Sequence, residues 1–296
     1  MRLAVTGKTG QVVTALLERA AIAGVEVITV GRPEFDLANP DSAAQLFDAL
    51  RPDVIVSAAA YTAVDKAESD SAVAHSVNAV GPGVVAQAAA RLGIPIIHLS
   101  TDYVFDGSKA APYAEDDATA PLGVYGSSKL AGEQAVAAAT PDHAILRTAW
   151  VYSPFGNNFL KTMLRVAADR PGLRVVDDQR GNPTSALDIA EAILDVARNL
   201  VARPDDAQLR GVFHMTGTGE GSWADFATEI FAASAERGGP SAAVVRIATA
   251  DYPTPARRPA NSRLSSARLA KIHHVVMPDW KLSTRETVAR LVPARY

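Results

Sequence analysis

The chain has 296 residues, of which 48% are hydrophobic and 21% charged, and this composition is typical of a globular protein with a sizeable core. Its formal net charge of −3 gives no electrostatic reason to expect nucleic acid or a membrane surface as a partner, and the absence of cysteine excludes disulfides, thiolate zinc sites and cysteine nucleophiles. A strand follows Met1 at once, without a signal peptide, and no apolar run reaches about 18 residues, so we expect a cytoplasmic protein.

The first segment has the strand–turn–helix pattern of a phosphate-binding site. An apolar strand over 3–6 leads into Gly7-Lys8-Thr9-Gly10 and then a helix over 11–23 with aliphatic residues at helical spacing. Gly7 allows the tight turn, and Gly10 lets the backbone approach a pyrophosphate on the helix amino terminus. Val13 replaces the usual third glycine. Without the flanking strand and helix, an ordinary turn would be the better interpretation.

The second strand, over 26–30, predicts which cofactor is bound. Arg32 follows it, where an NAD-specific site places an acid for the ribose hydroxyls, and a guanidinium there suits a 2′-phosphate. The alternative is a solvated loop arginine, because Gly31 and Pro33 leave its direction undetermined. A third strand is expected over 53–57, followed by small residues against which a cofactor can lie.

The next strand and helix predict the chemistry. Ile94 to Leu99 reads as a buried strand that ends at Thr101, and Tyr125 and Lys129 lie four apart on a helix expected over 126–139. An ammonium beside a phenol should lower the phenol pKa from about 10 toward neutrality. Because ligands bind at the carboxyl ends of strands in open α/β sheets, Thr101 and Tyr125 should converge on one substrate oxygen. A bare Tyr-x-x-x-Lys is also common on amphipathic helices without a catalytic role.

Later segments predict a substrate-binding region. Trp150 ends a strand expected over 144–151, where it either closes the core or stacks on a sugar ring, and we favour the sugar. Asn158 opens a helix whose amide groups can meet a diphosphate. Residues 251–263, rich in proline and arginine, form either a linker or an anion-binding loop, and Ser283-x-x-Glu286 predicts a capping box for the final helix.

Several of these strings together resemble a known family. Thr101 with Tyr125-x-x-x-Lys129, behind the glycine turn, is similar to the active-site set of the extended short-chain dehydrogenase/reductases. Within that superfamily the chain resembles the dTDP-4-dehydrorhamnose reductases over nearly its whole length. The matching strings are Gly7-Lys8-Thr9-Gly10-Gln11, the segment from Ala59 to Glu68, Ser100-Thr101-Asp102-Tyr103-Val104-Phe105, Thr148-Ala149-Trp150-Val151-Tyr152 and the segment from Pro253 to Pro259.

The resemblance implies an α/β fold, a doubly wound parallel (Rossmann-type) sheet with a second, smaller carboxyl-terminal α/β substrate domain. Residues 1–150 plus 185–215 should form the dinucleotide-binding domain, and 151–184 plus 216–296 the sugar-nucleotide domain. The implied reaction is NADPH-dependent reduction of the C4 carbonyl of dTDP-4-dehydro-L-rhamnose to dTDP-L-rhamnose, with NADH as an alternative cofactor. The rival interpretations are another nucleotide-sugar epimerase or dehydratase, and a non-catalytic NADP-binding regulatory subunit.

The same resemblance assigns roles to individual residues. The catalytic set is Thr101, Tyr125 and Lys129, and the substrate contacts are Thr101, Asp102, Trp150, Asn158 and Arg257. The cofactor contacts are Gly7, Gly10, Gln11, Val12, Arg32, Asp36, Leu37, Ala60, Tyr61, Thr62, Leu99, Tyr125 and Lys129.

No metal site is expected. The histidines show no metal-ligand spacing, and Ala15 and Leu187 align with glutamates through which some family members bind magnesium at a dimer interface. The expected partner is the dTDP-sugar, with no nucleic acid or membrane, and the chain should be a monomer or a homodimer.

Overall fold

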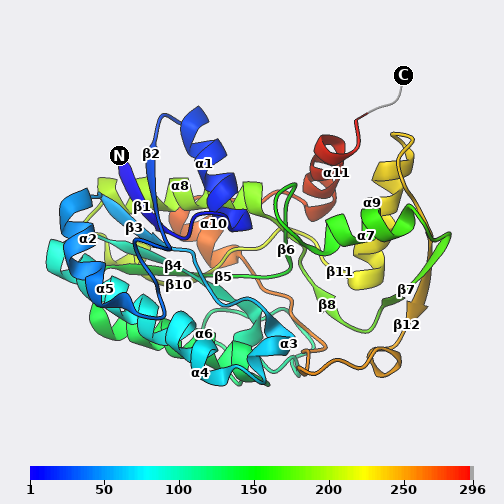
Figure 1. Ribbon diagram of the computed structural model, residues 1–296, viewed down its shortest axis with the longest axis horizontal. Coiled ribbons are helices and arrows are strands. Elements are labelled where there is room, and N and C mark those ends of the chain that lie inside the picture. The colour runs from blue at the N-terminus through cyan, green and yellow to red at the C-terminus, as the bar shows by residue number, and fades with distance from the viewer. Residues whose placement is uncertain (294–296) are drawn as a thin grey trace.

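The structure, a computed structural model, describes residues 1–293, and within them six parallel strands form a central sheet in the order β10-β5-β4-β3-β1-β2 (Figure 1). The chain runs outward from β1 to β2, then returns to β3 on the other side and continues to β10, so the winding direction changes between β1 and β3. Such a switch point opens a crevice at the carboxyl ends of the strands. The predicted doubly wound fold is therefore confirmed. The strands are β1 (Arg2–Thr6), β2 (Glu26–Val30), β3 (Val54–Ser57), β4 (Ile96–Thr101), β5 (His143–Thr148) and β10 (Gly211–His214).

Helices cover both faces of the sheet because successive strand residues point to opposite sides. Leu3 and Val5 pack in one core cluster with α1 (Gln11–Ile22) and α8 (Ala186–Ala202). Ala4, between them, belongs to the opposite cluster. That second cluster is closed by α2 (Ala43–Leu50), α5 (Gly81–Leu92) and α6 (Val124–Ala139).

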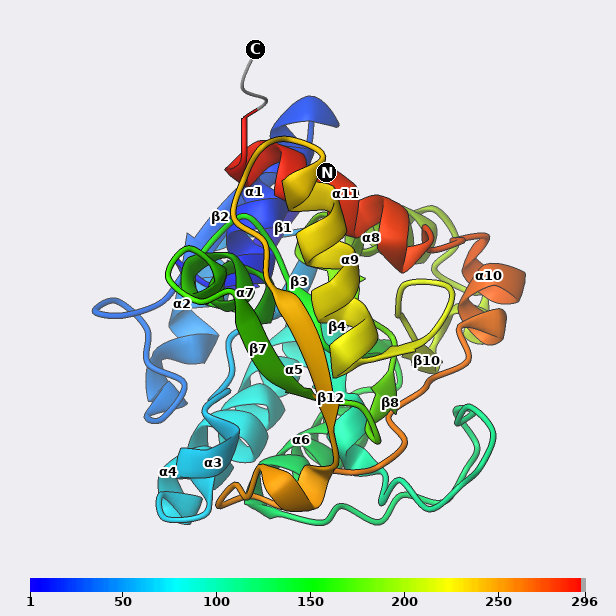
Figure 2. The same cartoon turned by 90° about the vertical axis from the view of Figure 1, so that its right-hand side faces the viewer.

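A third core cluster lies beside the sheet, around Tyr152, Phe226 and Trp280. Its strands β7 (Gly172–Val176) and β12 (Ala243–Ile247) pair in parallel, and both face the viewer with α9 in Figure 2. Its helices are α7 (Phe159–Ala167), α9 (Trp223–Ala235) and α11 (Trp280–Leu291). The short strands β6 (Val151–Tyr152), β8 (Arg180–Gly181), β9 (Thr184–Ser185) and β11 (Gly221–Ser222) join this cluster to the sheet region.

The remaining elements are short. They are α3 (Val64–Ala67), α4 (Ser71–His75), α10 (Ala267–His273), a π-helical turn η2 (Ser76–Val80) that joins α4 to α5, and 3-10 turns at Pro40–Ser42, Asp102–Val104, Ala207–Leu209 and Thr249–Asp251. Within residues 1–293, none of the helices combines the length and the apolar character needed to cross a membrane.

Two local expectations are wrong. The strand expected over 144–151 is divided into β5 and β6, because Trp150 adopts the left-handed region with φ of 47°. The final helix does not begin at Ser283. Asp279 caps it by accepting a hydrogen bond from the Lys281 amide at 2.8 Å, while Ser283 lies one turn inside and donates to the buried Asp188 carboxylate at 2.6 Å.

Candidate active site

A cavity of about 1320 Å³ lies at the carboxyl ends of the central strands. Its lining comes from the glycine turn, the loops after β2 and β3, the end of β4, the start of α6 and residues 148–158. Pockets for one small ligand usually measure about 300–1,000 Å³, so this cavity has room for two ligands side by side. It includes all the predicted site residues except Arg257.

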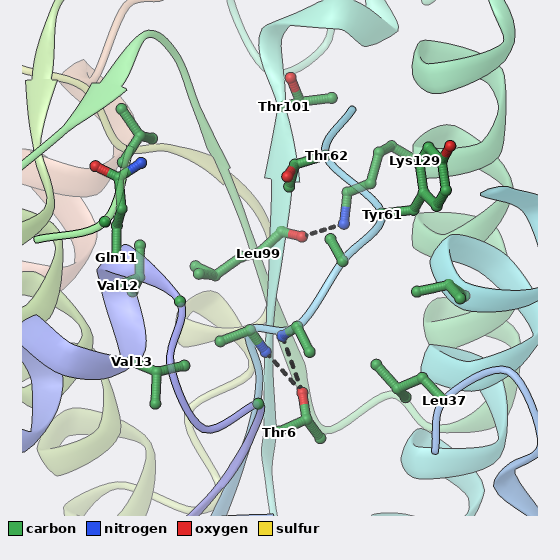
Figure 3. Close-up of a pocket in the computed structure, with 18 of the residues that line it drawn as sticks. Thr6, Gln11, Val12, Val13, Leu37, Tyr61, Thr62, Leu99, Thr101 and Lys129 are labelled. Carbon is green, nitrogen blue, oxygen red and sulfur yellow. Dashed lines mark hydrogen bonds between the residues drawn. The ribbon is translucent and has the colours of Figure 1, made fainter. Parts of the chain in front are cut away.

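The glycine turn forms one wall of this cavity. Gly7 has φ of 99°, which favours glycine, and its amide donates to Val30 O at 2.6 Å. The Thr6 hydroxyl accepts hydrogen bonds from the Ala58 and Ala59 amides at 3.0 and 3.1 Å, which ties the turn to the loop after β3 (Figure 3). Gly10, at the amino terminus of α1, gives no side-chain cap, so the first amides of α1 are available to an anion. This wall fits a pyrophosphate.

The loop after β2 forms the next part of the wall. Arg32 is exposed at the rim of the cavity, which it lines with Asp36 and Leu37, and it makes no ion pair within the part of the chain that the structure describes. Lys8, in the glycine turn, pairs with Glu34. A guanidinium without an acidic partner beside the cavity is suited to a phosphate.

The loop after β3 is held in place by the side chain of Asn78. Asn78, in the π-helical turn, is fully buried, and its side chain accepts from the Tyr61 amide at 2.8 Å and donates to the Tyr61 carbonyl at 3.1 Å. It also donates to the Ser128 hydroxyl at 3.0 Å, next to Lys129 in sequence. Asn78 therefore fixes the backbone of Ala60, Tyr61 and Thr62 relative to α6.

Lys129 projects from α6 toward β4. The side chain is 3% exposed, and Nζ donates to the Leu99 carbonyl at 2.6 Å (Figure 3). Burial lowers the pKa of Lys129 to about 8, and the nearby Glu133 carboxylate opposes this shift. The ammonium thus remains charged at neutral pH and titrates at mildly alkaline pH.

Tyr125 corrects one expectation. The pKa of its phenol is raised to about 12, first by burial and then by the charge on Asp102, while the neighbouring Thr101 hydroxyl acts in the opposite direction. The lowering expected from Lys129 is absent, because the ammonium is directed at Leu99 O and desolvation dominates. In this environment the phenol is protonated at neutral pH, which is the state required of a proton donor.

Thr101 and Asp102 end β4 beside the phenol. The Thr101 hydroxyl donates to Asp102 Oδ1 at 2.9 Å and accepts from the Tyr103 amide at 3.2 Å. Burial raises the pKa of Asp102 to about 6, and its second oxygen, Oδ2, has no hydrogen-bond partner in the described chain. The Thr148 hydroxyl, also on the cavity wall, is likewise buried without a partner among residues 1–293. Unpaired buried polar atoms are costly, and their position here suits a polar ligand.

Trp150 lies across the cavity and is stacked on a second tryptophan. Its ring and that of Trp223 have centroids 3.6 Å apart and planes 7° apart, and Gly181 provides the space on its edge, where a Cβ would approach to 2.4 Å. The left-handed backbone of Trp150 is strained for a bulky residue, and such strain clusters at functional sites. Both tryptophans line the cavity.

Asn158 links α7 to the glycine turn. Its side chain caps α7 by accepting from the Lys161 amide at 3.1 Å and donates to Gln11 Oε1 at 2.9 Å. The Ser153 hydroxyl donates to the same Gln11 oxygen at 2.8 Å. The side chain of Asn158 is therefore occupied by protein partners, although the residue lines the cavity as expected.

Arg257 lies outside the cavity. It is exposed, while its neighbour Arg258 pairs with both oxygens of Asp65 at 3.0 Å and Arg263 pairs with Glu220 at 3.0 Å. The segment 251–263 is thus fixed to the protein by Arg258 and Arg263, whose guanidinium groups are both paired with carboxylates and do not favour the anion-binding alternative.

The sequence did not reveal three residues of the wall. Tyr103 packs edge to face against Tyr125 at 5.4 Å, Thr148 presents its unpaired hydroxyl, and Trp223 stacks on Trp150. Tyr103 and Thr148 stand within the strings that matched the family. Trp223 lies outside those strings, as the first residue of α9 after the capping box formed by Ser222 and Asp225.

Residues 1–293 contain no group of three or more His, Cys, Asp or Glu side chains placed to hold a metal ion. Ala15 and Leu187 are buried in the core cluster between α1 and α8 and offer no ligand oxygen.

Comparison with known proteins gives concordant matches over the whole chain. The family model described as the RmlD substrate binding domain matches residues 1–292. A dTDP-4-dehydrorhamnose reductase of Sinorhizobium fredii is 53% identical over 292 residues, which cover 99% of this chain and 98% of the relative. The solved dTDP-4-dehydrorhamnose reductase of Clostridium acetobutylicum superposes with a TM-score of 0.90 at 37% identity, covering 98% and 99% of the two chains. That of Bacillus anthracis, solved in complex with NADP, has a TM-score of 0.89 at 32% identity, with the same coverage.

Proposed function

The chain belongs to the dTDP-4-dehydrorhamnose reductase family, and from that premise we propose that it reduces the C4 carbonyl of dTDP-4-dehydro-L-rhamnose to dTDP-L-rhamnose with NADPH. This is the reduction step of dTDP-rhamnose synthesis. Bound NADPH supplies the hydride. The glycine turn with Gln11 and Val12, Arg32 with Asp36 and Leu37, the loop from Ala60 to Thr62, and Leu99 would hold the cofactor.

The residues of α6 and β4 divide the work of the reaction. Tyr125 donates its proton to the C4 oxygen as that oxygen becomes negative, and the Thr101 hydroxyl hydrogen-bonds the same oxygen. Lys129 would bind the cofactor ribose with its buried ammonium. Asp102 and Trp150 orient the sugar, and the buried unpaired oxygen of Asp102 is available to a sugar hydroxyl.

The observation that carries this proposal is the position of the half-buried Tyr125 and the buried Lys129 on α6, beside the end of β4 and on the wall of a cavity with room for both ligands. A phenol with a pKa near 12 is protonated at neutral pH and gives up its proton only to a stronger base than its own phenolate. The alkoxide that forms at C4 is such a base. An exposed Tyr-x-x-x-Lys on a helix surface would have neither the shifted pKa values nor a position on a cavity wall.

We place the dinucleotide-binding domain at residues 1–150 plus 185–215 and the sugar-nucleotide domain at 151–184 plus 216–296. The third core cluster, with β7, β12 and α9, supports the second unit. We propose a cytoplasmic monomer or homodimer, and Asn158 and Arg257 as further substrate contacts. The direct protein bonds of Asn158 and the exposed place of Arg257 make them the weakest members of the set.

The test follows NADPH absorbance with dTDP-4-dehydrorhamnose and with its UDP-linked analogue. We expect turnover with the dTDP substrate. Tyr125→Phe should lower it by roughly 100-fold or more while NADPH binding survives, because general acid catalysis contributes about 10²–10⁴-fold. Near-normal turnover of Tyr125→Phe would remove Tyr125 from the role of donor. An epimerase or dehydratase would instead retain tightly bound NAD, and a regulatory subunit would bind NADPH without turnover.

A further inference from the structure

His98 is a polar residue in the middle of a fully buried strand. All six residues of β4 are buried, and His98, between Ile97 and Leu99, has no exposed surface. Parallel strands covered on both faces are normally apolar, and the reaction above gives His98 no task. A buried imidazole requires partners for its nitrogens, so its contacts indicate why it is there.

The two ring nitrogens of His98 face one hydroxyl and one ammonium. Nδ1 lies 3.1 Å from the Ser57 hydroxyl and Nε2 lies 3.5 Å from Lys129 Nζ. An ammonium can only donate, so Nε2 must be the acceptor and the ring proton must be on Nδ1, which donates to Ser57 Oγ. Burial and the charge on Lys129 lower the pKa of His98 well below its usual value, so the ring is neutral at working pH.

The charged and titratable groups around the imidazole come from two elements besides β4. α6 contributes Lys129 and Glu133, the latter neutralised by its bidentate pair with Arg147. β5 contributes Arg147 and His143, whose charge would further disfavour an imidazolium. Gly132 allows α6 to approach the backbone of Asn78, since a Cβ there would lie 2.1 Å from Asn78 O; the same Cβ would be in ordinary contact with His98 Nε2, at 3.5 Å.

We propose that His98 is a positioning residue that holds the Lys129 ammonium through its neutral Nε2. The ammonium then has two acceptors on β4, Leu99 O and His98 Nε2, and its third N–H would be left for the cofactor ribose. An acceptor beside the ammonium also favours the charged form and raises the pH at which Lys129 loses its proton. This inference rests on the proposed function for its kinetic test, but the tautomer of His98 is tested without turnover.

The kinetic test compares the pH profiles of the full-length protein and of His98→Leu. Activity should be lost as pH rises through the pKa of Lys129, because the neutral amine no longer holds the cofactor ribose. Loss of a weak hydrogen bond to a charge should move this alkaline limb by about one pH unit toward acid in His98→Leu. The KM for NADPH should also rise. His98→Gln, whose amide can donate to Ser57 and accept from Lys129, should restore the limb.

His214→Gln is the matched control. His214 is equally buried, but its Nδ1 faces the Tyr113 carbonyl and it contacts no part of the proposed active site, so the limb should stay in place. A uniform fall of kcat at all pH values in His98→Leu, with the alkaline limb unmoved, would overturn the proposal.

Nitrogen NMR of the unsubstituted protein provides a second measurement, which does not depend on folding of the variants or on the substrate. The expected signals are those of a neutral His98 ring with the proton on Nδ1, from pH 8 down to about pH 5.5, below the usual histidine pKa. A proton on Nε2, or protonation near pH 6.5, would also overturn it. If these signals are found in a protein that lacks turnover, the proposed function fails while the pairing of His98 with Lys129 stands.

Discussion

Removal of Arg147 should destabilise the protein strongly, because a buried carboxylate would lose its partner. Arg147, on β5, and Glu133, on α6, are each 4% exposed. Arg147 Nε donates to Glu133 Oε1 at 2.9 Å and Nη2 donates to Oε2 at 2.7 Å, while the Ser100 hydroxyl donates to Oε1 at 2.5 Å. This pair fixes α6, and so Tyr125 and Lys129, against the carboxyl ends of β4 and β5.

The magnitude follows from these contacts. Arg147→Met removes two charge-assisted hydrogen bonds and leaves a charge in the interior with one hydroxyl donor, and breaking such a pair costs about 3–5 kcal/mol. In a chain of this size we expect a fall in Tm of roughly 6–20 °C, from about 2–4 °C per kcal/mol. Replacing both partners by apolar residues, Arg147→Met with Glu133→Leu, should recover most of the loss, since a buried ion pair is often replaced by apolar residues at little cost.

The assay is a double-mutant cycle of urea unfolding with Arg147→Met, Glu133→Leu and the double variant. The coupling energy should be at least about 1.5 kcal/mol, as expected of residues that share one buried network. The matched control is Arg198, whose exposed pair with Asp195 should contribute less than about 1 kcal/mol when either partner is replaced by alanine. A loss below about 1 kcal/mol in Arg147→Met, or strictly additive single losses, would contradict the reasoning.

Four further outcomes are expected. The protein should prefer NADPH over NADH by roughly 10- to 150-fold in kcat/KM, which corresponds to one charge-assisted contact of about 1.5–3 kcal/mol, and Arg32→Ala should remove most of this preference. An unchanged ratio of kcat/KM in the variant would make Arg32 a solvated loop residue. EDTA should alter neither the rate nor the association state, and a dimer that dissociates on chelation would refute this. Asp102→Asn should stabilise the fold at pH 7 by up to about 3 kcal/mol while lowering kcat/KM. Burial raises the pKa of Asp102 to about 6 in the folded protein, so the wild-type protein loses stability as pH rises from about 4 to 6, and the variant, which has no carboxylate there, does not. Urea unfolding of both proteins at pH 4 and pH 7 measures the difference. Burial lowers the pKa of His273 to about 4, so between pH 6.5 and 5 the unfolded chain binds a proton that the folded chain does not, and the free energy of unfolding falls by about 2 kcal/mol. His273→Gln should not show this loss of stability in urea unfolding measured across the same pH range. An identical pH dependence in the variant would exclude His273 as its source.

The sheet and the glycine turn that lines the cavity could be predicted from the sequence because their signals are local. The strand over 3–6, the glycines of the turn and the helix after it each obey a rule that acts within a few residues. The tryptophan stack could not be predicted, since Trp150 and Trp223 are separated by 73 positions and no local pattern joins them. Ser283 shows the opposite failure. It matched a local capping pattern, but Asp279 was also a good cap one turn earlier and allowed Ser283 to bond Asp188 in the interior.

The pKa of Tyr125 is a property of the site that residue spacing in the sequence could not predict. A separation of four placed Tyr125 and Lys129 on one face of α6, and the structure keeps that arrangement. The lysine stem has four carbons, however, so its Cα position does not decide where the charge lies. The acceptors on β4 decide it, and Leu99 O draws the ammonium to 2.6 Å. The pKa of the phenol is then set mainly by desolvation, which depends on how α6 packs against the sheet and cannot be read from the spacing of the two residues. Charge placement in this site is therefore a property of β4, where His98 and Leu99 O meet the ammonium, as much as of the helix that carries the reactive pair.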